Sequence, residues 1–243
     1  MKQISIAIIV TLLAAFMAQA QKPVRILSLN NSLIEVNGQT AMFNAMAAAD
    51  GLDMRWEKRT QLGRTLLFHY NDELSKSLVA SQPWDIIILQ EQSSLPRTMP
   101  ETLLESVKLW KKFILANCPN PQAEIIVPMN WAYSGEWESF KADSQALHKS
   151  FMNVARDIPG VRVCPVGDAV ADVFERGGAS AAGLLYNDYC HPSLRASYLA
   201  ACMEYAMITG RDPAAITFVP EGLDRAVAKE MRELASRFAP WRK

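Results

Sequence analysis

Short apolar runs alternate with longer amphipathic segments along this 243-residue chain. Runs of branched apolar residues predict buried strands, whereas apolar residues at helical spacing that stop at Gly or Pro predict helices. The predicted strands are Val24–Leu29, Asp53–Lys58, Asp85–Leu89, Glu124–Val127 and Val161–Val166, and the predicted helices are Gln39–Asp50, Asp72–Ser81, Glu101–Asn117, Glu138–Arg156, Asp168–Arg176, Ser193–Thr209 and Glu221–Phe238. This alternation predicts an α/β fold, a three-layer, doubly wound sandwich with a parallel sheet.

The first twenty residues, MKQISIAIIVTLLAAFMAQA, have the pattern of an export signal. Lys2 gives a positive start, Ile6–Met17 is mostly apolar, and Ala18-Gln19-Ala20 matches the small-x-small pattern of a cleavage site. The alternative is a membrane anchor. A spanning helix needs about 20 apolar residues, however, and the apolar run here is shorter and ends in a cleavage-like site. We therefore expect a signal peptide at 1–20, a single domain at 21–243, a periplasmic or secreted location, and no stable membrane insertion after cleavage.

The charge balance argues against a nucleic-acid partner. The chain has 25 Lys and Arg against 25 Asp and Glu, so its formal net charge is zero. Binding to phosphates depends on a surplus of basic side chains, and no basic block is present. The three histidines and the lack of a Cys-x-x-Cys pair also give no zinc-ligand spacing, so we expect no metal.

Export makes the four cysteines candidates for disulfides, and four cysteines allow three pairings. A chain of this size also buries enough core to fold without disulfides, so free buried thiols are the alternative. The four residues are Cys118, Cys164, Cys190 and Cys202.

Polar residues follow several of the predicted strands. The carboxyl ends of parallel strands meet at one edge of a sheet, where ligands of such folds bind. The segments expected at this edge are Asn30-Asn31-Ser32, Gln90-Glu91-Gln92-Ser93 and Pro128-Met129-Asn130-Trp131-Ala132-Tyr133, joined by Asp188-Tyr189-Cys190-His191-Pro192-Ser193 from near the C-terminus. Together they contain a hydroxyl nucleophile, a base, an acid and neutral hydrogen-bond donors.

Serine hydrolysis requires this set of groups. An imidazole must take the proton of the weakly nucleophilic serine, and a carboxylate must orient the imidazole. Asp188 and His191 are three residues apart, a spacing that lets the carboxylate fold back onto the ring in a tight turn. The alternative is structural: Ser32 as a helix cap, and Asp188 with His191 as a surface turn. We interpret His69 and His148 as structural.

The ordered pair of a serine block and an Asp-x-x-His block resembles the SGNH/GDSL hydrolase family, which has a flavodoxin-like sandwich. Asn30-Asn31-Ser32-Leu33 is similar to the family's first block, Gly-Asp-Ser-Leu, and Asp188-Tyr189-Cys190-His191 matches its last block. The resemblance implies that Ser32 is the nucleophile, that His191 is the base and that Asp188 orients it.

The resemblance also implies an oxyanion hole. The family forms it from the serine N–H, a glycine N–H and an Asn side-chain amide, for which we expect Ser32, Gly63 and a glutamine. The third strand ends in Gln-Glu-Gln in place of Gly-x-Asn-Asp, and a Gln amide can donate the same hydrogen bond as Asn. We favour Gln90 as this donor, with Gln92 as the alternative.

These expectations describe an exported esterase that works through an acyl-enzyme and needs no cofactor. Export and the residues after the fourth strand favour an O-acetylated carbohydrate as substrate, with Asn130, Trp131 and Tyr133 as binding residues, because sugar faces pack on aromatic rings. One alternative is a lipase or thioesterase with the same triad. Another is a non-catalytic carbohydrate-binding protein, since fold does not fix function.

Overall fold

The computed structural model describes residues 22–133, 137–177, 181 and 183–240, and its centre is a five-stranded parallel sheet. The strand order is β2-β1-β3-β4-β5, and every neighbouring pair is parallel. The strands are β1 (Val24–Asn30), β2 (Met54–Thr60), β3 (Ile86–Leu89), β4 (Glu124–Pro128) and β5 (Val161–Cys164). The predicted doubly wound α/β fold is therefore confirmed.

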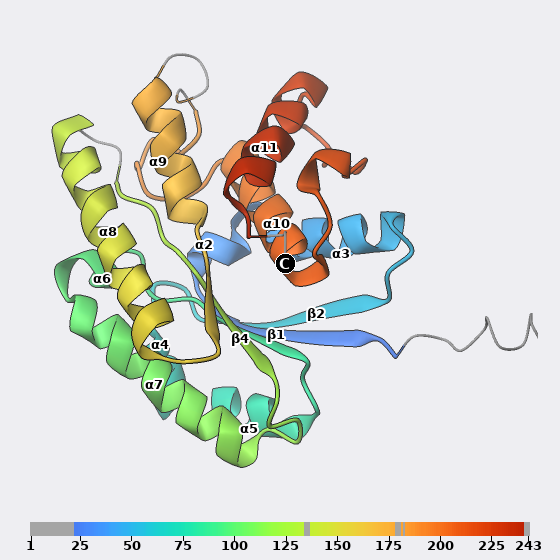
Figure 1. The fold of residues 1–243 in the computed structure, drawn as a ribbon, viewed down its shortest axis with the longest axis vertical. Coiled ribbons are helices and arrows are strands. Elements are labelled where there is room, and N and C mark those ends of the chain that lie inside the picture. Colours follow the sequence, from blue (N-terminus) through green and yellow to red (C-terminus); the bar gives the residue numbers. More distant parts are fainter. Residues whose placement is uncertain (1–21, 134–136, 178–180, 182, 241–243) are drawn as a thin grey trace, which may run out of the picture.

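Helices cover both faces of the sheet (Figure 1). One layer contains α3 (Gln39–Ala49), α10 (Leu194–Thr209) and α11 (Arg225–Phe238), and the other contains α4 (Leu66–Asn71), α5 (Glu73–Ser81) and α7 (Pro100–Asn117). Near β5, α8 (Trp137–Asp157) packs on α7, and α9 (Val166–Arg176) packs on α11. The short helices α2 (Ser32–Glu35) and α6 (Leu95–Thr98) follow β1 and β3.

The chain crosses from one side of β1 to the other after β2, since β2 and β3 pair with opposite edges of β1. This reversal is the topological switch point at which open α/β sheets bind ligands. Ser32 follows β1 and Gln90 follows β3. Ser32 and Gln90 therefore lie next to the position at which this sheet is expected to bind a ligand.

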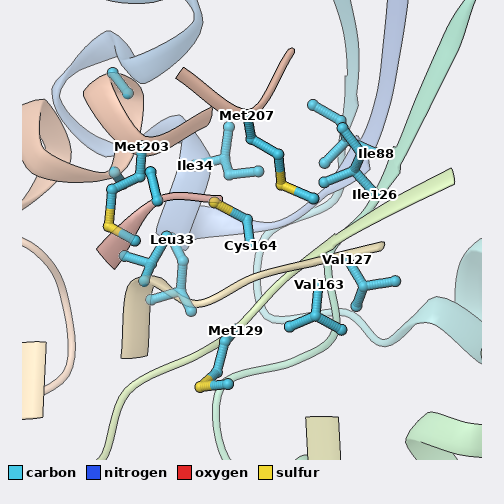
Figure 2. Close-up of a cluster of buried hydrophobic side chains, with 14 of the residues drawn as sticks. Leu33, Ile34, Ile88, Ile126, Val127, Met129, Val163, Cys164, Met203 and Met207 are labelled. Atoms are coloured by element: carbon cyan, nitrogen blue, oxygen red, sulfur yellow. The ribbon is translucent and has the colours of Figure 1, made fainter. Parts of the chain in front are cut away.

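The core lies on both faces of the central strands. All four residues of β3 are buried, as are Ile26, Leu27 and Leu29 of β1. On one face, Leu33 and Ile34 of α2 lie with Met203 and Met207 of α10 in a buried cluster (Figure 2). Burial of these apolar side chains anchors the short helix that begins with Ser32.

Element boundaries agree with the sequence expectations to within a few residues, with physical reasons for the differences. The last helix begins at Arg225 rather than Glu221, because the Asp224 side chain caps it by accepting from the N–H groups of Ala226 and Val227. The fifth strand ends at Cys164, two residues early. The short helices α2, α4 and α6 were not predicted, since segments of four to six residues carry too little periodicity.

The predicted signal peptide lies outside the residues that the structure describes. Within the described ranges, no helix is both long and apolar enough to cross a membrane.

Candidate active site

The carboxyl ends of β1, β3 and β4 are joined by hydrogen bonds between the polar residues that follow them. The Asn31 N–H donates to Gln90 Oε1 at 3.0 Å, and Asn130 Nδ2 donates to the Gln92 carbonyl at 2.9 Å. Three of the predicted polar segments thus meet at one edge of the sheet, as expected for a parallel arrangement.

Ser32, His191 and Asp188 form a continuous hydrogen-bonded chain. His191 Nε2 lies 2.9 Å from Ser32 Oγ, and His191 Nδ1 lies 2.6 Å from Asp188 Oδ2. Ser32 and His191 are partly exposed, so a substrate can reach the hydroxyl. This arrangement can transfer the serine proton to the imidazole while the carboxylate holds the ring.

The loop that carries His191 is held by its own aspartate. Asp188 Oδ1 accepts from the N–H groups of Cys190 (3.0 Å) and His191 (2.9 Å). The His191 side-chain bond and these two main-chain bonds lower the pKa of Asp188 to about 2. Tyr189 lies in the left-handed region (φ 59°), which closes the turn. Asp188 is therefore ionised at neutral pH.

Ser32 stands at the first position of α2 because Asn31 caps that helix. The Asn31 Oδ1 accepts from the Leu33 N–H at 3.1 Å, and its Nδ2 donates to the carbonyls of Glu91 (3.1 Å) and Arg64 (3.3 Å). The cap fixes the start of the helix, and the buried side chains of α2 fix its rotation. Ser32 is therefore placed by the hydrogen bonds of the Asn31 side chain before it and by the buried side chains of α2 after it.

Gly63 lies in the exposed loop between β2 and α4, at φ +68°. Its N–H has no partner among the described residues. The adjacent Arg64 carbonyl accepts from the Asn31 side chain, which ties this loop to the residue before Ser32. The predicted oxyanion role of Gly63 stays a prediction.

The two glutamines considered for the oxyanion have different surroundings. Gln90 is 3% exposed, and its Oε1 accepts from Asn31 while its Nε2 has no partner within the described ranges. Gln92 Oε1 instead accepts from the N–H groups of Ser94 and Leu95, so this side chain shapes the turn that begins α6. The free amide of Gln90 keeps it the favoured donor.

Asn130 and Trp131, which were expected to bind a sugar, are buried and bonded within the protein, and their binding roles stay predictions. Asn130 is 2% exposed, and its amide donates to the carbonyls of Glu91 and Gln92. Trp131 is 7% exposed, and its Nε1 donates to the Cys190 carbonyl at 2.8 Å. Asn130 thus connects the ends of β4 and β3, and Trp131 connects the end of β4 to the loop of His191.

Tyr133 is 39% exposed, and its hydroxyl lies 2.7 Å from Ser93 Oγ. Of the three residues expected to bind substrate, it alone presents substantial surface. Its role stays a prediction.

The remaining histidines have structural contacts. His69 is fully buried, with Nδ1 2.9 Å from Ser75 Oγ and Nε2 3.2 Å from the Asn30 carbonyl. Burial lowers its pKa. His148 is exposed and contacts Asp168 at 3.0 Å. Neither lies in the chain of hydrogen bonds that includes Ser32.

The structure has the four cysteines as free thiols. Cys190 is partly buried and the other three are buried: Cys118, Cys164 and Cys202. Among the described residues, no three His, Cys, Asp or Glu side chains gather in a way that could hold a metal ion.

Glu91 is a residue of the site that the sequence reasoning did not single out. It is fully buried beside the strand ends, and its Oε1 accepts from the N–H groups of Leu66 (3.0 Å) and Gln92 (2.7 Å). The available signal was a charged residue two positions after the wholly apolar strand β3.

Comparison with known proteins identifies the fold. Neither the protein-family models nor the curated proteins give a match. Among solved structures, a DUF4886 family protein from Bacteroides uniformis is 17% identical, with a TM-score of 0.77 over 89% of this chain and 94% of its own. A presumed SGNH hydrolase from Slackia heliotrinireducens is 26% identical, with a TM-score of 0.62 over 77% of this chain and 100% of its own.

A third solved structure is a catalytic mutant of Axe2, an acetylxylan esterase from Geobacillus stearothermophilus. It is 14% identical, with a TM-score of 0.55 over 74% of this chain and 93% of its own. These similarities extend over most of each chain, and they show that this chain has the fold of the SGNH hydrolases.

Proposed function

We propose that this chain, which has the SGNH hydrolase fold, is an exported serine esterase. The observation that carries the proposal is the 2.9 Å contact between His191 Nε2 and Ser32 Oγ, with Asp188 on the far side of the ring. A serine hydroxyl in contact with an oriented imidazole is the activated nucleophile of acyl transfer.

In the first half of the reaction, Ser32 Oγ attacks the ester carbonyl and its proton passes to His191 Nε2. The carbonyl oxygen becomes an oxyanion, which accepts hydrogen bonds from the N–H groups of Ser32 and Gly63 and from the Gln90 amide. The carbon–oxygen bond then breaks, and His191 gives its proton to the leaving alcohol. The acyl group remains on Ser32.

In the second half, water attacks the acyl-enzyme and gives a proton to His191. Collapse of the second tetrahedral intermediate releases the carboxylic acid and returns the proton to Ser32. Throughout, ionised Asp188 keeps His191 Nδ1 as the hydrogen-bond donor, so that Nε2 faces the serine.

We assign O-acetylated carbohydrates as the substrate class. The partly exposed ring of Tyr133 and the exposed rings of Tyr186 and Tyr189 on the loop that carries His191 support this assignment, because aromatic faces pack against sugars. The similar fold of an acetylxylan esterase is consistent with it.

The proposed export rests on the amino-terminal sequence. Cleavage after Ala20 would leave Gln21 as the first residue, so mass spectrometry of the protein recovered from its natural host tests this part.

The experiment that tests the activity compares wild type with Ser32→Ala and His191→Ala on a chromogenic acetate ester. Ser77→Ala and His148→Ala are matched controls, because both residues are exposed and lie outside the site. We expect each site variant to lose activity by about 1000-fold or more while the controls retain it. A wild type without activity, or an active Ser32→Ala, would refute the proposal, and the former would favour a non-catalytic carbohydrate-binding role.

A further inference from the structure

A buried carboxyl group lies directly behind the candidate site. Glu91 has no exposed surface, and its Oε2 has no partner within the part of the chain that the structure describes. Burial raises its pKa to about 7, partly offset by hydrogen bonds from two main-chain N–H groups.

This placement is costly for folding. A buried carboxylate loses its hydration, and a hydrogen-bonding oxygen without a partner adds a further penalty. No ion pair joins Glu91 to a Lys, Arg or His among the described residues. A group that lowers stability in this way beside a candidate site is a candidate for a role in function.

The contacts of Glu91 reach the three segments that surround Ser32. Its Oε1 holds the N–H of Leu66, which starts α4 at the end of the loop that contains Gly63. The same oxygen holds the Gln92 N–H after β3. Its main-chain carbonyl accepts from the Asn31 side chain, which caps the helix of Ser32.

We infer that Glu91 is a positioning residue of this esterase. Its carboxyl group holds the loop of Gly63 against the Ser32 turn, and this keeps the oxyanion donors in position. The inference rests on the proposed function. Glu91 acts through Leu66 and Gln92. Hydrogen-bond donors aimed at the oxyanion stabilise the transition state, so a displaced loop lowers kcat more than it changes KM.

Two substitutions of Glu91 distinguish the need for a hydrogen-bond acceptor at this reach from the need for a negative charge. Glu91→Gln keeps an oxygen at the same reach, so both N–H groups retain an acceptor. Glu91→Asp keeps the charge but draws the oxygens back by one methylene, out of reach of the Leu66 N–H. Positioning predicts that kcat falls about 10-fold or more in Glu91→Asp with KM within about 2-fold, and that Glu91→Gln stays within about 3-fold of wild type.

Glu204 supplies a matched control. It is also fully buried, with one oxygen bonded to Gln39 Nε2 at 2.7 Å and the other without a partner within the described ranges, but it lies on α10. Glu204→Asp makes the same change at a carboxyl group that bonds to Gln39 and not to the loop of Gly63, so it should lower stability while leaving kcat per folded molecule within about 3-fold.

The test is the kinetics of Glu91→Asp, Glu91→Gln and Glu204→Asp on the chromogenic acetate ester, with amide hydrogen exchange of residues 61–66 in each. We expect faster exchange of this loop in Glu91→Asp only. Equal losses of kcat in Glu91→Asp and Glu204→Asp, or in Glu91→Asp and Glu91→Gln, would overturn the inference, as would unchanged exchange in Glu91→Asp. If wild type hydrolyses no ester, the proposed function fails, and the exchange rates still decide whether Glu91 holds the loop.

Discussion

His191 Nε2 lies 2.9 Å from Ser32 Oγ, although the two residues are 159 positions apart in the chain. Ser32 is held by the end of β1 and the cap of α2, and His191 is held by the Asp188 turn just before α10. Two independently fixed segments thus meet with the geometry that serine acyl transfer requires.

Replacing Asp188 by Asn should remove most activity at neutral pH. The Asn oxygen can still accept from the Cys190 and His191 N–H groups, so the loop should persist, but the carboxylate that stabilises the imidazolium is lost. We expect kcat to fall about 1000- to 10,000-fold with little change in KM, measured by steady-state kinetics. A loss below about 10-fold would contradict the assigned role.

The effect of Asp188→Asn on the unfolding free energy should depend on pH. Because the folded-state pKa of Asp188 is lowered to about 2, its ionised form stabilises the fold above the pKa of an unfolded aspartate and loses this effect as the pH falls toward 2. The unfolding free energies of wild type and Asp188→Asn should therefore differ at pH 6 and converge near pH 2. A difference that persists unchanged at pH 2 would show that the carboxylate charge is not its source.

Trp131→Phe tests whether the hydrogen bond of Trp131 to the loop of His191 supports activity. The substitution removes the N–H donor to the Cys190 carbonyl and leaves space in a buried site, so stability should fall by about 1 to 3 kcal/mol. Because the loop of His191 loses a tether, kcat should also fall about 10-fold. Trp84→Phe is the control, since Trp84 is also buried and donates to the Leu78 carbonyl away from the site. Equal effects of the two variants on kcat would refute the tether.

Glu204 makes stability depend on pH in the opposite direction to Asp188. Burial raises its folded-state pKa to about 8, so the neutral acid fits the fold and stability is lost as the pH rises from about 4.5 to 8. Glu204→Gln should therefore exceed wild type in unfolding free energy by about 1 to 3 kcal/mol at pH 9, with a smaller difference at pH 5. Urea titrations at both values, with the exposed Glu221→Gln as control, provide the measurement. Parallel profiles for wild type and Glu204→Gln would contradict the raised pKa.

The substrate class predicts a short acyl group and an aromatic contact. Acetate esters should have the highest kcat/KM in a series of acyl lengths, and a preference for eight or more carbons would favour a lipase or thioesterase. Tyr133→Ala should raise KM for an acetylated oligosaccharide about 3- to 10-fold while leaving KM for the small acetate ester unchanged. Equal changes on both substrates would argue against sugar packing on Tyr133.

The sequence pattern was sufficient for the sheet and for its order of helices and strands. Strands such as Ile86–Leu89 are wholly apolar because both faces are covered, and this makes them recognisable without a structure. The rule that parallel strands end at one edge also brought the turn of Ser32 beside Gln90. Among the described residues, His191 does not directly follow a strand, and its place beside Ser32 was expected from the Asp-x-x-His resemblance. Both features depend on patterns within short segments or on topology.

The roles of individual side chains around the site required the structure. Trp131 and Asn130 follow a strand, as binding residues often do, but only the structure shows that both are buried and donate to main-chain carbonyls. The contacts of Glu91 could not be predicted from the sequence for the same reason. Its partners come from the end of the loop after β2 and from its own neighbour in the chain. Sequence order does not show which atoms face each other across such a junction.

The most direct test of the central claim is covalent labelling with a fluorophosphonate, followed by peptide mapping by mass spectrometry. Such a reagent forms a stable adduct with a serine that an imidazole activates. The adduct should lie on Ser32 in wild type, and it should be absent in Ser32→Ala and strongly reduced in His191→Ala. A label on another residue, or equal labelling of Ser32 in His191→Ala, would contradict the account.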